Sequence, residues 1–88
     1  MATLIKTDCS QTEVFPKDKE NGFTLDEVYA LIGCELVEIA CRFKDGKMML
    51  VDEEGLLKPD QEVNPLASML FGDYIVGNAL IVEDEEFQ

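Results

Sequence analysis

The pair Asp45-Gly46 lies between two β-prone segments and limits the folds that this chain can adopt. An Asp-Gly pair in this setting is typical of a β-hairpin turn, because glycine tolerates the positive φ angles of tight turns. Cys34–Phe43 before the pair alternates between apolar and polar residues, and Met48–Val51 after it is apolar. The two segments are therefore predicted to form an antiparallel hairpin within a larger sheet.

A two-residue loop sets the predicted register of this hairpin. It places Phe43 opposite Met48 and Cys41 opposite Leu50. Because side chains alternate between the two faces of a strand, Met48 and Leu50 are expected to point into the core.

The second strand of the hairpin runs into the carboxylates Asp52–Glu54. The predicted register would set Glu38 opposite Glu53, and like charges at opposite positions destabilise a sheet. Regular pairing is therefore expected to stop near Val51, where the carboxylates begin.

The same carboxylates raise the question of a cation site. A calcium loop needs oxygen ligands at alternating positions before its glycine, whereas Asp52–Glu54 is contiguous. We therefore predict no metal site and interpret the run as a solvated turn. In this interpretation Gly55 has a positive φ angle, and Leu56 and Leu57 return the chain to the core.

A helix is predicted in FTLDEVYALIG. Thr24 and Glu27 form a capping box, Phe23 and Val28 are spaced as a hydrophobic staple, and Gly33 ends the helix. The residues expected on its buried face are Leu25, Val28, Tyr29 and Ile32.

A shorter helix, PLASMLF, begins with Asn64 as its cap and Pro65 at its first position. Its predicted buried face consists of Leu66, Met69 and Leu70. Tyr74–Val82 follows and is apolar on both faces, which is typical of a central strand. Gly77-Asn78 within it indicates a bulge or a close backbone approach.

The N-terminal runs Thr3–Lys6 and Thr12–Phe15 are predicted to form another hairpin around the turn Asp8–Ser10. The element order is then β-β-α-β-β-α-β, which favours a single α+β domain with a mainly antiparallel sheet of about five strands. Both helices are expected to pack on one face of that sheet. The domain is predicted to span residues 1–82, and residues 83–88 form an acidic tail.

The chain of 88 residues has 19 acidic and 7 basic residues and a formal charge of −12. Such a charge argues against direct binding to a nucleic acid, which needs clustered Lys and Arg. No run of apolar residues is long enough for a membrane span or a secretion signal. The odd set Cys9, Cys34 and Cys41 indicates free thiols, mainly as small buried side chains, in the cytoplasm.

Catalytic and cofactor-binding motifs are absent from the sequence. There is no histidine to pair with a nucleophile or to complete a zinc site, and no glycine-rich phosphate loop. We therefore predict a protein that is not an enzyme and binds no cofactor. The densest basic group, Arg42, Lys44 and Lys47 near the hairpin tip, is a candidate anion site.

Several stretches together resemble a small domain of unknown function that recurs in bacteriophage, plasmid and integrative-element genomes. They are FTLDEVYALIG with CELVEI, then DGKMMLVDEEGLLK, the helix start NPLA, and FGDYIVGNALIV, and they cover most of residues 3–82. The resemblance implies an accessory protein of a mobile element with no assigned activity and no catalytic residues. Asn64 matches the asparagine before the family's second helix, and Glu54, Gly55, Leu57 and Lys58 match its E-G-x-L-K element. Pro59–Val63, an acidic connector, departs from the family pattern.

These observations predict a non-catalytic module that binds a protein with a basic surface, such as a host defence or nucleic-acid-handling protein. The alternative is a protein that binds or sequesters a small anionic ligand. Nothing in the sequence specifies an oligomeric state. The candidate partner-binding residues are Asp52, Glu53, Glu54, Glu83, Asp84, Glu85 and Glu86.

Overall fold

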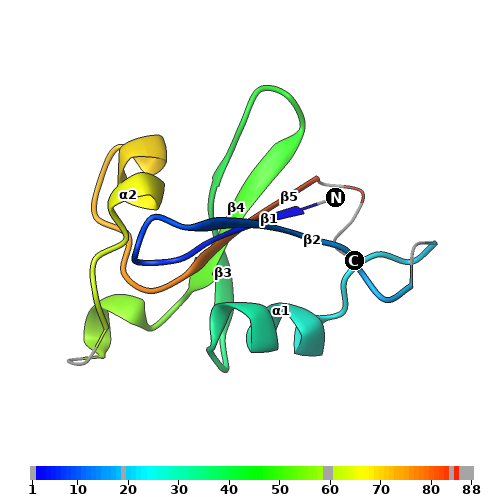
Figure 1. Cartoon of the computed structure of the whole chain (residues 1–88), viewed down its shortest axis with the longest axis horizontal. Coiled ribbons are helices and arrows are strands. Elements are labelled where there is room, and N and C mark those ends of the chain that lie inside the picture. Colours follow the sequence, from blue (N-terminus) through cyan, green and yellow to red (C-terminus); the bar gives the residue numbers. More distant parts are fainter. Residues whose placement is uncertain (1, 19, 59–60, 84, 86–88) are drawn as a thin grey trace.

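The structure, a computed structural model, describes residues 2–18, 20–58, 61–83 and 85 (Figure 1). These residues form one five-stranded sheet with the strand order β2-β1-β5-β4-β3, and each pair of neighbouring strands is antiparallel. The predicted α+β class and element order are confirmed. The elements are β1 (Ala2–Ile5), β2 (Gln11–Val14), α1 (Leu25–Ile32), β3 (Val37–Arg42), β4 (Lys47–Asp52), the 3₁₀ turn η1 (Gly55–Leu57), α2 (Pro65–Phe71) and β5 (Ala79–Glu83).

The N-terminal hairpin is confirmed, with both strands beginning one residue earlier than predicted. Ala2 pairs with Val14, and the Cys9 amide donates to the Lys6 carbonyl at 3.0 Å to close the turn. Cys9 has a φ angle of 71° and is exposed, so it is not the buried side chain that we expected.

The prediction that the last apolar segment is a central strand is also confirmed, because β5 lies between β1 and β4. The strand is shorter than predicted and begins at Ala79, after Gly77. Gly77 has a φ angle of 82°, and a Cβ atom there would lie 2.9 Å from Oε1 of Gln61. Gly77 therefore has a backbone conformation that favours glycine, and the predicted close approach is made by the side chain of Gln61.

The loop of the β3–β4 hairpin has three residues, not the predicted two. The Phe43 amide donates to the Lys47 carbonyl at 2.8 Å, so Phe43 lies opposite Lys47 and not opposite Met48. Gly46, the third loop residue, has a φ angle of 89°. An Asp-Gly pair also suits a three-residue loop in which glycine has the left-handed conformation, so the pair does not determine the loop length. Because the loop is one residue longer than predicted, the predicted register was wrong.

A bulge at Ala40 changes the register again. Ile39 pairs with Leu50 and Cys41 pairs with Met49, so Ala40 is an extra residue in β3. As a result Glu38 lies opposite Val51 and the expected clash with Glu53 does not occur. Pairing ends at Val37 and Asp52, one residue beyond the predicted end.

The capping box of α1 is present as predicted. The Glu27 amide donates to Oγ1 of Thr24, and the Thr24 amide donates to Oε1 of Glu27, both at 3.2 Å. Gly33 ends the helix with a φ angle of 83°. Val28 and Ile32 are buried, but Leu25 is 46% exposed. Because helical side chains tilt toward the N-terminus, Leu25 at the first position projects beyond the covered part of the helix.

The sheet has a hydrophobic cluster on each face, so the prediction that both helices pack on one face was wrong. In Figure 1, α1 lies below the strands, whereas α2 lies above them and to the left. Successive residues of β4 point to opposite faces, and all of them after Lys47 are buried. The cluster around α1 contains Ala2, Leu4, Phe23, Val28, Ile32, Met48, Leu50, Leu80 and Val82, and the cluster around α2 contains Met49, Val51, Ala67, Ile75 and Ala79.

The short helix α2 begins as predicted, with Oδ1 of Asn64 accepting from the Ala67 amide at 3.0 Å. Its buried face differs from the prediction. Ala67 is fully buried, whereas Met69 is 78% exposed, Leu70 is also exposed and Leu66 is half-buried. The helix therefore contacts the core through a small residue and presents large apolar side chains to solvent.

Candidate interaction surface

The acidic turn after β4 is built around an ion pair. Asp52 is 5% exposed, and its Oδ2 accepts from Nζ of Lys58 at 2.7 Å. Oδ1 of Asp52 accepts from the Glu54 amide at 2.9 Å. Hydrogen bonding to Asp52 raises the pKa of the Lys58 ammonium. Asp52 is therefore part of the fold, and only Glu53 and Glu54 of the predicted acidic turn are exposed.

Gly55 serves this turn by its small size. It is not among the described glycines with a positive φ angle, so the predicted reason for a glycine here was wrong. A Cβ atom at Gly55 would lie 3.0 Å from the carbonyl oxygen of Val76, which comes from the segment before β5. The prediction that Leu57 returns to the core was also wrong, because Leu57 is 79% exposed.

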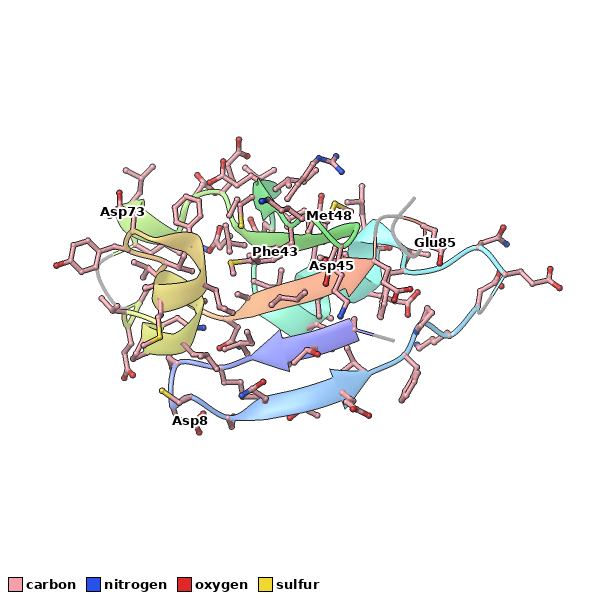
Figure 2. The ribbon with its side chains drawn as sticks, turned by 90° about the horizontal axis from the view of Figure 1, so that it is seen from above. Asp8, Phe43, Asp45, Met48, Asp73 and Glu85 are labelled. Carbon is pink, nitrogen blue, oxygen red and sulfur yellow. The ribbon has the colours of Figure 1, made fainter. Side chains whose placement is uncertain are left out.

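The predicted partner-binding acids do not form one patch. Glu53 and Glu54 follow the end of β4, whereas Glu83 pairs with Lys47 at the start of the same strand. A strand of this length separates its ends by roughly 17 Å. Glu85 is exposed on the side of Glu83, and Figure 2 shows it far from α2. Asp84 and Glu86 lie outside the described residues.

The candidate anion site at the hairpin tip is surrounded by carboxylates. Nζ of Lys47 lies 3.9 Å from Oδ2 of Asp45, and the Lys47 amide donates to Oδ1 of Asp45 at 3.1 Å. Asp45, Glu83 and Glu85 line one hollow beside the tip. Arg42 and Lys44 are exposed nearby. The site stays a prediction, but this setting is unfavourable for an anion.

The three cysteines have free thiols, as predicted. Cys34 and Cys41 are half-buried, and burial raises the pKa of both thiols. The Asp52 carboxylate raises the pKa of Cys34 further. Since the thiolate is the nucleophile, both side chains are weakly reactive.

The structure shows a groove that the sequence did not reveal, on the sheet face that carries α2. It has a volume of about 480 Å³ and lies between β3 and the segment that joins α2 to β5. Ala40 and Val51 line it from the sheet. Phe71 and Tyr74 line it from the opposite side and are 38% and 71% exposed.

Acidic side chains surround this groove. Glu38 from β3 and Glu53 from the turn after β4 line it on the sheet side, and Asp73 lines it beside α2 (Figure 2). All three are exposed. We define the acidic groove as the space bounded by these three carboxylates and by Ala40, Val51, Phe71, Tyr74 and Ile75.

The wall of the acidic groove beside α2 is held by hydrogen bonds. The Asn64 amide donates to the Ile75 carbonyl at 2.7 Å, and the Ile75 amide donates to Oγ of Ser68 at 2.8 Å. The Tyr74 amide donates to Oδ1 of Asp73 at 2.7 Å. The backbone at Ile75, next to Tyr74, is therefore anchored to the start and the middle of α2.

Sequence reasoning missed the acidic groove because it assigned Tyr74 to a strand and Met69 and Leu70 to a buried face. The signal was available in SMLFGDY, where apolar residues continue around the whole short helix and beyond Gly72. A seven-residue helix cannot bury all of its faces against one sheet, so some of these side chains had to be exposed.

Among the described residues, no group of three or more Cys, Asp or Glu side chains is placed to hold a metal ion. In the same part of the chain, no helix has the length and hydrophobicity to cross a membrane.

The family model described as a domain of unknown function (DUF3846) matches residues 4–88. No curated protein and no solved structure matches the chain. The match covers nearly the whole chain, including the acidic C-terminal residues that lie beyond the resemblance seen in the sequence. The chain therefore belongs to the DUF3846 family of domains of unknown function.

Proposed function

We propose that this protein is a non-catalytic acidic accessory protein of a mobile element that binds a protein partner with a basic surface. The observation that carries the proposal is the acidic groove, where exposed carboxylates surround exposed apolar side chains. Apolar surface of this kind is often an interaction site when polar residues surround it. The partner would be a cytoplasmic host defence or nucleic-acid-handling protein.

The net charge of the chain favours such a partner. With a formal charge of −12, the protein attracts a basic surface over the Debye length, which is about 8 Å at physiological ionic strength. Complementary charges of this kind raise the association rate more than the final affinity. The same charge repels nucleic-acid phosphates, so the proposal includes no direct binding to DNA or RNA and no attachment to anionic membranes.

Capture from a host lysate at low and at physiological salt tests the proposal. The partner is identified by mass spectrometry and purified, and its dissociation constant is measured as a function of salt. We expect a basic protein whose affinity falls as salt rises. Capture of no basic protein, or an affinity that does not change with salt, would contradict the proposal.

A charge-reduced variant is the control for this experiment. Glu13→Gln with Glu20→Gln removes two exposed carboxylates that do not line the acidic groove, one of them on β2 at the opposite edge of the sheet from β3. We expect this variant to bind the partner more slowly, with a dissociation rate close to that of the wild type.

A further inference from the structure

We infer that the acidic groove is the docking site for an extended segment of the partner that carries basic and apolar side chains on the same face. This inference rests on the proposed function and adds the place and the chemistry of binding. Three features of the described residues support it: the apolar lining, the carboxylates around it, and the open edge of β3.

The chain itself covers only part of the apolar lining of the acidic groove. Val51 is buried at the floor, while Tyr74 and Phe71 are exposed and Ala40 is half-buried. Burying apolar surface stabilises a complex by roughly 25 cal/mol per Å² before the costs of association. A partner segment with Leu, Ile or Val side chains would gain this energy by packing between Tyr74 and Ala40.

The surrounding carboxylates select the charge of the partner segment. Glu38, Glu53 and Asp73 line the groove together with the apolar residues, and no Lys or Arg is among its lining residues. Side chains two positions apart in an extended segment point to the same side, so a Lys or Arg two residues from an apolar side chain would place its cation near these carboxylates. The rings of Phe71 and Tyr74 add a favourable surface for the same cation.

The edge of the sheet favours an extended conformation of the segment. β3 ends the strand order, so one side of its backbone has no strand beside it among the described residues. The Glu53 amide donates to the Leu36 carbonyl at 3.1 Å, which turns the backbone polar groups of Leu36 toward β4. By the alternation of an antiparallel ladder, those of Val37 and Ile39 point outward. An added strand could pair with them over a short stretch that ends at the Ala40 bulge.

A second copy of this chain is a poor occupant of the acidic groove. Each copy carries a formal charge of −12, and a symmetric contact would bring Glu38 and Asp73 close to the carboxylates of the other copy. Like charges opposed across an interface cost several kcal/mol. The charge on the chain thus favours a different, basic protein.

Titration of the labelled protein with a short synthetic peptide tests the inference by NMR. In this peptide lysine and leucine alternate along one face of the extended chain, and serine occupies the positions between them. We expect the largest amide shifts at residues that line the acidic groove, such as Ala40 and Tyr74. A peptide with glutamate in place of lysine should cause no saturable shifts. Saturable shifts that are equally large at Glu13 and Glu20, which do not line the acidic groove, would overturn the inference.

Variants then separate the acidic groove from the general charge. We expect Glu38→Gln with Asp73→Asn to weaken peptide binding about fivefold, because two surface ion pairs are lost. Glu13→Gln with Glu20→Gln removes the same charge elsewhere and should change the affinity by less than about twofold. Tyr74→Ala, at a mainly exposed side chain, should weaken binding without unfolding the protein, as the NMR spectrum will show. Equal effects of the two double variants would overturn the inference.

The two proposals fail in different ways. If a basic partner binds with salt-dependent affinity but is insensitive to Glu38→Gln with Asp73→Asn, the docking site is wrong and the proposed function stands. If neither a basic partner nor the lysine peptide binds, both proposals are wrong. If the protein is a dimer in sedimentation and Tyr74→Ala dissociates it, the occupant is a second copy and the inference is wrong.

Discussion

Nδ2 of Asn64 donates to the carbonyl oxygen of Ile5 at 2.9 Å, which joins the start of α2 to β1 across 59 positions of the chain. Nδ2 also donates to the Gly77 carbonyl at 3.0 Å, while Oδ1 accepts from the Ala67 amide. The residue is 0% exposed. One buried amide therefore caps a helix and fixes two other segments, and it supports the wall of the acidic groove.

We expect Asn64→Ala to lower the free energy of unfolding by about 2–4 kcal/mol, which urea denaturation measures. The helix loses its cap, and the carbonyls of Ile5 and Gly77 each lose a buried donor. Asn64→Asp keeps the acceptor for Ala67 but removes both donors and buries a carboxylate, so it should be at least as destabilising.

Asn21→Ala is the matched control. Nδ2 of Asn21 donates to Oδ2 of Asp18 at 2.7 Å on the exposed surface, and we expect its loss to cost less than about 1 kcal/mol. Equal losses of stability for Asn64→Ala and Asn21→Ala would show that the buried amide does not have the structural role described here.

The ion pair between Asp52 and Lys58 should make stability depend on alkaline pH. The pKa of Lys58 is raised above its ordinary value near 10.5 by the hydrogen bond to Asp52. Above that value the folded state holds a proton that the unfolded state has released, so stability falls as pH rises through the folded pKa. We expect Lys58→Met to be less stable at neutral pH, because Asp52 stays buried without its cation, and less sensitive to pH above about 10.

Lys44→Met is the control for this measurement, because Lys44 lies exposed at the hairpin tip. It should match the wild type in thermal unfolding at neutral pH and keep the wild-type loss of stability at alkaline pH. If Lys58→Met and the wild type lose stability in parallel between pH 9 and pH 11, roughly the range around the ordinary lysine pKa, the ion pair does not control this dependence.

Features encoded by neighbouring residues were predictable from the sequence. Thr24 and Glu27 are three residues apart and cap α1, and Asn64 with Pro65 begins α2. In both cases the side chain bonds to a backbone amide of the same turn, so no tertiary contact is needed to recognise it. The central position of β5 was predictable because its segment is apolar up to Val82 on both faces, which is typical of a strand that is buried on both faces.

Features that depend on tertiary packing were not predictable. An Asp-Gly pair is compatible with loops of two and three residues, and the bulge at Ala40 lets Cys41 and Phe43 pack against the cluster around α2. The alternation of apolar and polar residues in β3 therefore suggested that the sheet has a core on one face, whereas it has a hydrophobic cluster on each face. For the candidate site, the acidic run suggested a solvated surface, because the sequence did not show that Lys58 folds back onto Asp52.

The carboxylate of Glu27 should make stability depend on acidic pH. Its Oε2 accepts from the Lys17 amide at 3.1 Å, and its Oε1 accepts from the Thr24 amide. These bonds lower the pKa of Glu27 below its ordinary value of 4.5. The resulting stability is present above that value and is lost as pH falls through the lower, folded pKa. We expect Glu27→Gln to be less stable than the wild type at pH 7, roughly neutral conditions, with the difference narrowing below about pH 4.

Thermal unfolding as a function of pH checks this expectation, with Glu13→Gln as the control. Glu13 lies exposed on β2, so we expect the melting temperature of Glu13→Gln to stay close to that of the wild type at every pH. A constant deficit of Glu27→Gln from neutral to acidic pH would mean that the capping carboxylate contributes through packing and not through its charge.

The charge of the whole chain leads to a final expectation about salt. The chain has 19 acidic residues and only 7 Lys and Arg, so its formal charge is −12 and the carboxylates of the folded state repel one another. Raising the ionic strength from about 10 mM to about 100 mM shortens the Debye length from about 30 Å to about 10 Å. We therefore expect sodium chloride to raise the melting temperature by several degrees, roughly the effect of 1 kcal/mol on a domain of this size.

A variant with three exposed carboxylates replaced, Glu13→Gln, Glu20→Gln and Glu35→Gln, provides the comparison, measured by differential scanning calorimetry. It has less repulsion to screen, so it should melt higher than the wild type at low salt and respond less to added salt. If the wild type and the variant respond equally, the salt effect does not come from the repulsion among carboxylates. A melting temperature that does not rise with salt would mean that the acids are compensated locally, as Asp52 is by Lys58.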